Sequence, residues 1–305
     1  MKRLILPFIL ICLITLELVY MDDIKKFATD LINNRPSLII EPSNDYTKNY
    51  DFLFVQRNDT YVPYSLKDIR NVFYSVINNG WDEFTFYCPT EYEDCVKDIQ
   101  TISGNDVLLT DINNYASPYN SFTSIETTYD DSGEINIKLK KLYTKEQINE
   151  INNVVDKIIK ENIKDNMDDE KKIRTIHDYI INNTEYDKVR NDTGESEYDS
   201  NTAYGTLLQH QAICSGYADA MELFLNKFNI KNYKIASKTH VWNAVYINNK
   251  WLHLDLTWDD PVSDRGPILD HKYFLITNKE LVEADGEDNL NTHKFDKSIY
   301  LEFNN

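Results

Sequence analysis

The chain has 305 residues, of which 42% are hydrophobic and 12% aromatic, enough for one or two domains with a buried core. These proportions exclude a disordered chain. The 50 acidic residues outnumber 32 basic ones and give a formal charge of −18. This charge argues against nucleic acid as a partner, because the phosphate backbone attracts basic surfaces.

Residues 1–21 have the pattern of an export signal. Lys2 and Arg3 precede a nearly unbroken apolar run, and positive flanks of such runs stay in the cytoplasm. No small-x-small cleavage site follows the run, which favours an uncleaved signal anchor over a cleaved signal peptide. We therefore expect an extracytoplasmic protein at the cell surface, either membrane-anchored or secreted.

Three further segments follow from composition and pattern. Residues 22–50 contain clusters of Asn, Pro and Asp and are interpreted as a spacer. Residues 51–164 mix helical and strand patterns without a constellation that carries chemistry, which predicts a smaller α+β region. Residues 165–305 carry the candidate site and are interpreted as the catalytic domain.

Capping and turn residues mark the elements of the 51–164 region. Ser65 begins a helix that Gly80 ends. Residues 84–87 and 134–139 alternate like half-buried strands. Thr144, followed three residues later by a glutamine, forms the capping box of a second helix.

The four cysteines fall into different settings. Cys12 lies in the apolar run. Cys88 and Cys95 are close in sequence and, outside the cytoplasm, can form a disulfide or remain two free thiols. Cys214 has no evident partner, and an odd thiol in an exported protein is a candidate reactive group.

A helix, a loop and a strand precede the candidate site. Residues 173–182 form a helical stripe that Asn166 can cap, and His177 on this stripe is interpreted as a satisfied core histidine. The polar stretch 183–201 predicts a loop. Residues 233–237 predict a short strand.

The next two strands form a predicted hairpin. The alternation of side chains between the two faces of a strand tests this prediction. Residues 240–247 and 250–256 are joined by Asn248 and Asn249, which tolerate positive φ. With these two as turn residues, His240 and Asp255 become diagonal neighbours on one face, about 7–8 Å apart at the backbone. The opposite, apolar face holds Val241, Val245, Ile247, Leu252, Leu254 and Leu256.

Cys214 completes a constellation for nucleophilic catalysis. It lies where a turn passes into a helix, and the positive end of a helix favours a thiolate. A thiolate, the His240 imidazole as base and the Asp255 carboxylate to orient the base make an acyl-transfer site. The backbone N–H of Cys214 is a candidate oxyanion donor, and Gln209 or Trp242 could supply a second.

Two alternatives concern the same residues. His253 shares a face with His240 and could compete as the base. A metal site could combine His210 with Cys214, four residues later, but His210 precedes the helix rather than lying on it. No loop has the carboxylate spacing of a calcium site. We therefore predict no metal and no cofactor.

These residues also carry a resemblance to a known family. The runs Ala-Ile-Cys214-Ser-Gly-Tyr-Ala, Thr-His240-Val-Trp-Asn and Trp-Leu-His-Leu-Asp255-Leu-Thr-Trp-Asp-Asp-Pro resemble the bacterial transglutaminase-like superfamily. The order and spacing of Cys, His and Asp are similar to that family's triad. The stretch beginning at Tyr204 resembles the family's upstream flank, which makes Tyr204 a further supporting candidate. Residues 271–276 resemble its C-terminal strand.

The resemblance implies a fold and a range of reactions. The fold is papain-like and of the α+β class, with an antiparallel sheet packed on the nucleophile helix. The implied enzyme is an exported Gram-positive cysteine acyltransferase or hydrolase that acts on protein or cell-wall peptide substrates through a thioester. The alternatives are a catalytically silent binding module on the same scaffold and a structural cell-wall protein attached through its N-terminal region.

Overall fold

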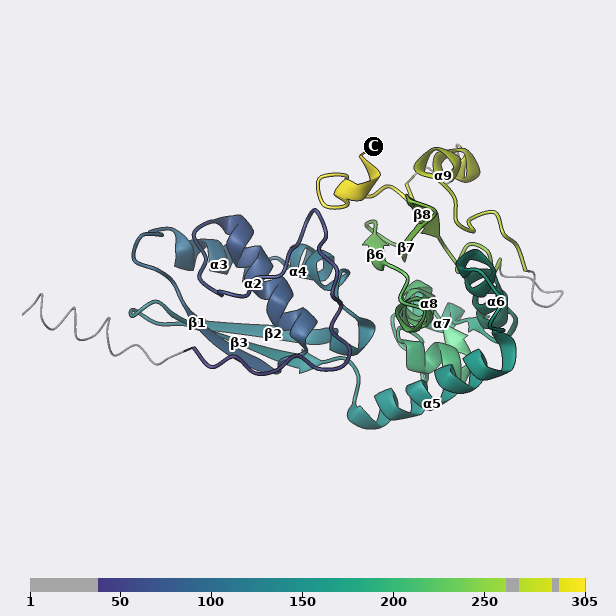
Figure 1. The fold of residues 1–305 in the computed structure, drawn as a ribbon, viewed down its shortest axis with the longest axis horizontal. Coiled ribbons are helices and arrows are strands. Elements are labelled where there is room, and N and C mark those ends of the chain that lie inside the picture. The colour runs from purple at the N-terminus through teal and green to yellow at the C-terminus, as the bar shows by residue number, and fades with distance from the viewer. Residues whose placement is uncertain (1–37, 262–268, 287–290, 305) are drawn as a thin grey trace, which may run out of the picture. The chain divides into compact units, whose positions relative to one another are not determined.

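The computed structural model describes residues 38–261, 269–286 and 291–304. The chain from Glu41 onward forms one compact unit, drawn in Figure 1. The predicted signal at residues 1–21 lies outside the described residues. Within the described ranges, no helix is long and apolar enough to cross a membrane. Residues 41–50, expected to belong to a spacer, are part of the compact unit.

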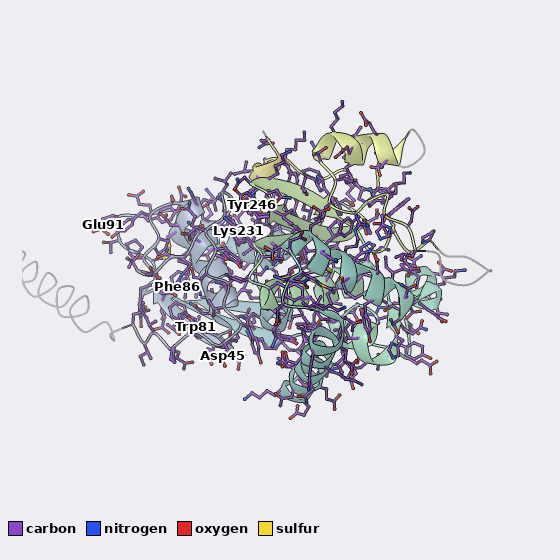
Figure 2. The ribbon with its side chains drawn as sticks, turned by 45° about the vertical axis from the view of Figure 1, so that its right-hand side comes forward. Asp45, Trp81, Phe86, Glu91, Lys231 and Tyr246 are labelled. Atoms are coloured by element: carbon purple, nitrogen blue, oxygen red, sulfur yellow. A yellow bond between two sulfur atoms is a disulfide. The ribbon has the colours of Figure 1, made fainter. Side chains whose placement is uncertain are left out.

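The first half of this unit is a three-stranded antiparallel sheet with helices beside it (Figure 1). The sheet has the order β1-β3-β2, with Phe84 opposite Ile137 and Thr127 opposite Ile137 on the other side. Trp81 and Phe86, labelled in Figure 2, lie in its core. The elements are α2 (Leu66–Asn79), β1 (Glu83–Tyr87), α3 (Cys95–Ser103), α4 (Asp106–Asn113), the 3₁₀ turn η1 (Pro118–Asn120), β2 (Phe122–Tyr129) and β3 (Glu134–Lys141).

The predicted helix signals of this region are confirmed. The Ser65 side chain accepts a hydrogen bond from the third residue of α2, and Gly80 ends that helix with φ of 74°. Both bonds of the Thr144 capping box are present at the start of α5 (Lys145–Asn162). Cys88 and Cys95 form a disulfide, so the alternative of two free thiols is not realised.

The second half begins with helices, and here two predictions need correction. The cap of α6 (Asp169–Asn182) is Asp168 and not Asn166, because the Asp168 carboxylate accepts the N–H of Lys171. The stretch 183–201 is not loop throughout. It contains β4 (Glu185–Tyr186), which pairs with a later strand, and α7 (Lys188–Thr193), which Asp187 caps.

The remaining elements build the sheet that carries the site. They are η2 (Gly205–Gln209), a short π-helical turn, β5 (Gln211–Ala212), α8 (Cys214–Lys227), β6 (Asn232–Ala236), β7 (Val241–Ile247), β8 (Lys250–Leu254), α9 (Asn278–Asp285) and the 3₁₀ turn η3 (Leu301–Phe303). β6, β7 and β8 form an antiparallel sheet that packs on α8. The predicted α+β class, with an antiparallel sheet on the helix that begins at Cys214, is confirmed.

The hairpin register is the predicted one. Ile247 pairs with Lys250 and Asn243 with Leu254, while Asn248 and Asn249 both have positive φ, at 52° and 61°. The expected C-terminal strand over 271–276 is reduced to a single bridge between Ile276 and His253.

The sheet is buried on both faces. Val245 and Leu254 lie in the core with α6 and α8, as the alternation predicted. The opposite face is also covered, because Phe295 and Phe303 of the C-terminal segment pack against Trp242 and His253.

Candidate active site

Cys214 is the first residue of α8, where the sequence placed it. The chain approaches this point through the two-residue pairing of β4 with β5, after a turn in which His210 has φ of 59°. No side chain caps the start of α8, so its first backbone N–H groups remain available near the sulfur. Cys214 is a free thiol and is partly exposed.

Gly216 holds the start of α8 close to the preceding segment. A Cβ atom at this position would lie 2.4 Å from the backbone oxygen of Ser200 and 2.8 Å from the hydroxyl oxygen of Thr206. The backbone can approach this closely because glycine has no side chain. The N–H of Ile213 also donates to the Ser200 carbonyl at 2.8 Å. These contacts fix the position of Cys214.

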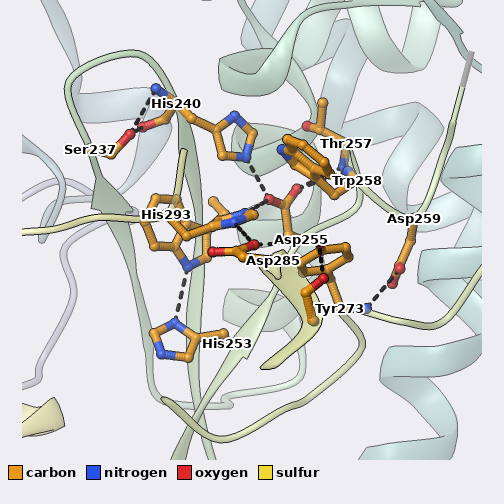
Figure 3. Close-up of polar contacts among 12 residues, drawn as sticks. Ser237, His240, His253, Asp255, Thr257, Trp258, Asp259, Tyr273, Asp285 and His293 are labelled. Carbon is orange, nitrogen blue, oxygen red and sulfur yellow. Dashed lines mark hydrogen bonds and ion pairs between the residues drawn. The ribbon is translucent and has the colours of Figure 1, made fainter. Parts of the chain in front are cut away.

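His240 lies just before β7, at the end of a tight turn. Its backbone N–H donates to the Ser237 hydroxyl at 3.1 Å, and its carbonyl accepts the Ser237 N–H at 2.8 Å. The ring Nε2 lies 2.5 Å from Oδ2 of Asp255 (Figure 3). Cys214 is near enough to this ring to raise the pKa of His240, and since Nε2 faces Asp255, Nδ1 is the nitrogen left for the sulfur.

Asp255 follows β8 and is buried. Its Oδ1 accepts the backbone N–H groups of Thr257 at 2.9 Å and Trp258 at 3.2 Å. Its Oδ2 accepts from His240 and, at 2.8 Å, from Nε2 of His293. Burial alone would raise the pKa of Asp255, but the two neighbouring imidazoles lower it well below its usual range. Asp255 is therefore a carboxylate near neutral pH.

The charge on His240 follows from these neighbours. Burial alone would lower the pKa of His240. Attraction to Asp255 and hydrogen bonds to Asp255 and Cys214 outweigh burial and raise this pKa to about 10. A protonated imidazole at physiological pH favours the thiolate form of the adjacent cysteine.

The competing base, His253, has a different role. It is buried, and its Nδ1 accepts the indole N–H of Trp242 at 3.0 Å. Burial and the nearby His293 lower the pKa of His253 to about 3. Among the described residues, His240 is therefore the imidazole that joins the cysteine to the carboxylate.

The three further candidates, Gln209, Trp242 and Tyr204, form hydrogen bonds with residues other than Cys214. Trp242 donates its N–H to His253, although its ring stacks on that of His240 with centroids 5.6 Å apart. The Gln209 side-chain oxygen accepts the backbone N–H of Asp199 at 2.7 Å, and the Tyr204 hydroxyl donates to Glu150 at 2.8 Å. Trp242 and Tyr204 thus use their donors elsewhere. The bond to Gln209 engages its oxygen and not its N–H groups, so Gln209 and the backbone N–H of Cys214 stay the predicted oxyanion donors.

Sequence reasoning missed two residues next to the site. His293 donates to Asp255, and its other ring nitrogen lies 2.7 Å from Oδ1 of Asp285. Asp285 ends α9, and His293 lies in the segment after it. Neither residue lies in a motif, and no periodic pattern connects them with the hairpin, so the sequence offers no signal for this contact.

Two groups of described residues bring three potential metal ligands within 4.8 Å: His177, Asp178 and His271, and His240, Asp255 and His293. In both groups the potential ligand atoms already face one another in hydrogen bonds of 2.5–2.9 Å. We interpret both as hydrogen-bonded networks. The first includes His177, which is buried and also contacts Asp259 at 3.1 Å, as expected of a satisfied core histidine.

The metal alternative through His210 is not formed. Nδ1 of His210 lies 2.8 Å from the backbone oxygen of Asn183. His210 belongs to neither of the two groups. Its left-handed backbone conformation ends η2 and places it before α8 rather than on it.

Comparison with known protein families gives a match over the part of the chain that holds the candidate site. Residues 156–256 match the sequence model of the transglutaminase-like superfamily, a span that contains Cys214, His240 and Asp255. No curated protein matches the chain. A solved structure described as "Crystal structure of a TGase" is 15% identical, covers 45% of this chain and 45% of its own, and has a TM-score of 0.34. The chain thus spans less than half of that protein. The match to the superfamily identifies a transglutaminase-like domain within this chain.

Proposed function

We propose that the protein is a cysteine acyltransferase or hydrolase that uses Cys214, His240 and Asp255 as a triad. The observation that carries the proposal is the hydrogen bond between the His240 ring and the buried Asp255 carboxylate, with Cys214 near enough to His240 to raise the pKa of its imidazole. The thiol lies at an uncapped helix start, and the imidazole is held in one orientation by a buried carboxylate. These are the parts that thioester chemistry requires.

The reaction follows from this geometry. The Cys214 thiolate attacks a carboxamide or peptide carbonyl carbon, a C–S bond forms, and the oxyanion accepts the backbone N–H of Cys214. His240 gives its proton to the leaving nitrogen as the C–N bond breaks, which leaves a thioester. Water or an amine then loses a proton to His240 and attacks the thioester, and the C–S bond breaks to restore the Cys214 thiolate and the His240 imidazolium.

The proposed substrates are proteins or cell-wall peptides outside the cytoplasm. Two features support this setting. The N-terminal sequence has the pattern of an export signal, and Cys88 forms a disulfide with Cys95, a bond typical of oxidising compartments. Water as acceptor gives hydrolysis or deamidation, and an amine gives cross-linking.

The test is the pH dependence of Cys214 alkylation by iodoacetamide, read on the Cys214 peptide by mass spectrometry. We expect rapid labelling well below the pKa of about 8.5 of an ordinary thiol, and slower labelling in His240→Ala. Asp255→Asn should cut turnover by about 10²–10⁴-fold in amine-incorporation or peptide-hydrolysis assays. Cys214→Ala is the control for both measurements. Labelling that rises only near pH 8.5 would reject the triad and favour a silent binding module.

A further inference from the structure

The carboxylate of Asp255 contacts a second histidine besides His240. Nε2 of His293 lies 2.8 Å from the same Oδ2 of Asp255 that faces His240 (Figure 3). Asp255 is held at Oδ1 by backbone N–H groups, so its two oxygens have separate partners. The orientation of Oδ2 therefore depends on the two imidazoles that share it.

His293 is itself held by a second carboxylate. Its Nδ1 lies 2.7 Å from Oδ1 of Asp285, which also accepts the hydroxyl of Tyr273 at 3.4 Å. A carboxylate only accepts hydrogen bonds, so an acceptor faces each ring nitrogen of His293. Both ring nitrogens of His293 are therefore engaged, one by each carboxylate.

The His293 ring is buried among aromatic side chains. Its ring centroid lies 4.9 Å from that of Trp242, 5.5 Å from that of Trp258 and 5.2 Å from that of Tyr273. These three rings and the two carboxylates restrict the orientation of the imidazole.

We propose that His293, held by Asp285, is a positioning residue that fixes Oδ2 of Asp255 toward His240 and shares the negative charge of that carboxylate. The inference rests on the proposed function, since it concerns the same triad. A second ring N–H on the same Oδ2 weakens the hold of the carboxylate on the His240 proton. His293 thereby sets the pH at which His240 changes from imidazolium to base.

The titratable groups around His293 come from several elements. Asp255 and His253 belong to the hairpin, Asp285 ends α9, and Tyr273 lies in the segment between them. His240 faces His293 edge-on, with ring centroids 5.2 Å apart. Of these, Asp255 is the group that contacts both His293 and His240 through hydrogen bonds, so the coupling passes through it.

The experiment is the pH profile of Cys214 alkylation by iodoacetate in the full chain. Because iodoacetate is an anion, its rate rises as the thiolate forms and falls as the neighbouring imidazolium loses its proton. The profile is therefore a bell whose alkaline limb reports His240. Wild type is compared with His293→Leu, which removes the ring N–H from Oδ2 of Asp255, and with Asp285→Asn.

We expect the alkaline limb of His293→Leu to move to higher pH, because Oδ2 of Asp255, with one donor fewer, holds the His240 proton more strongly. Asp285→Asn should move the limb in the same direction by less, since the histidine stays in place. His253→Gln is the matched control, because it replaces a buried histidine that hydrogen-bonds Trp242 instead of Asp255. Its limb should stay at the wild-type pH.

Three results would overturn the inference in different ways. If both variants keep the alkaline limb of the wild-type profile at the same pH, whatever their labelling rates, the role of His293 is rejected and the triad is left intact. An equal shift in His253→Gln would show a general packing effect. A wild type without a bell would reject the proposed function itself. Circular dichroism identifies a variant that fails to fold, and the other variant then decides.

Discussion

At the scale of single residues, His240 makes the stability of the fold depend on pH. Its pKa is raised to about 10 in the folded chain, against about 6.5 for an unperturbed histidine. Between these two values the folded state binds more protons than the unfolded state. The stabilisation from His240 is therefore fully present below pH ~6.5 and is lost as the pH rises toward about 10.

This predicts a measurable difference between wild type and His240→Gln. Urea unfolding at pH 6.5, 8 and 9.5 should show the free energy of unfolding falling more steeply with pH in wild type than in the variant. Titrations of groups that do not contact His240 are common to both proteins and cancel in the comparison. Parallel curves would contradict a raised pKa at this residue.

At the scale of elements, the start of α8 depends on the absence of a side chain at Gly216. An added Cβ would lie 2.4 Å from the Ser200 oxygen and 2.8 Å from the Thr206 hydroxyl, so the backbone must shift. We expect Gly216→Ala to lower the free energy of unfolding by about 1–3 kcal/mol. Since Cys214 lies two residues away, its alkylation by iodoacetamide should also slow.

The control for this variant is Ser215→Ala on the same turn of α8. Ser215 is partly exposed, and replacing it removes no close backbone contact. Denaturant unfolding and the labelling rate of Cys214 are measured on both proteins. A Gly216→Ala protein with wild-type values for both would show that the contact with Ser200 is easily relaxed.

At the scale of the whole molecule, a buried ion pair joins Lys48, near the start of the compact unit, to α8. Nζ of Lys48 lies 2.5 Å from Glu222 of α8, and their side chains are 3% and 0% exposed. Lys48 also donates to the backbone oxygen of Asn232 in β6 at 3.0 Å. Burial lowers the pKa of Lys48 and raises that of Glu222, and their mutual attraction opposes both shifts.

Removing one partner of this pair should therefore lower the free energy of unfolding far more than removing both. Lys48→Met leaves a buried carboxylate and is expected to lower the free energy of unfolding by about 3–5 kcal/mol, while Lys48→Met with Glu222→Leu should recover most of it. Lys227→Met breaks an exposed pair with Asp156, 2.8 Å long, and should cost under ~1 kcal/mol. Equal losses in the single and double variants would contradict a strong buried pair.

Local patterns predicted the part of the site that lies within one hairpin and one helix start. The Asn248–Asn249 turn fixes the register, and a period of two then places His240 and Asp255 on one face. Cys214 was placed by the change from turn to helical spacing. These signals are short in range and strong, because a slip of one residue would expose the apolar face.

Contacts between distant segments were not predictable in the same way. His293 lies 38 residues after Asp255, and α9, the one helix described between them, is only eight residues long. Lys48 was assigned to a spacer because its neighbours favour turns, yet it contacts Glu222 in α8. Such pairs depend on tertiary packing, which overrides the local composition.

Asp255 has an evolutionary consequence beyond its role with His240. It accepts four hydrogen bonds, two from the backbone turn after β8 and two from imidazoles, so any replacement leaves buried donors without an acceptor. Cys214 is partly exposed, and a serine or alanine there disturbs little packing. Under the proposed function, selection for a folded chain alone would retain the aspartate and let the cysteine drift in descendants that lose the activity. The residue at position 214, rather than the one at 255, is therefore the marker to follow when active and inactive descendants are sorted.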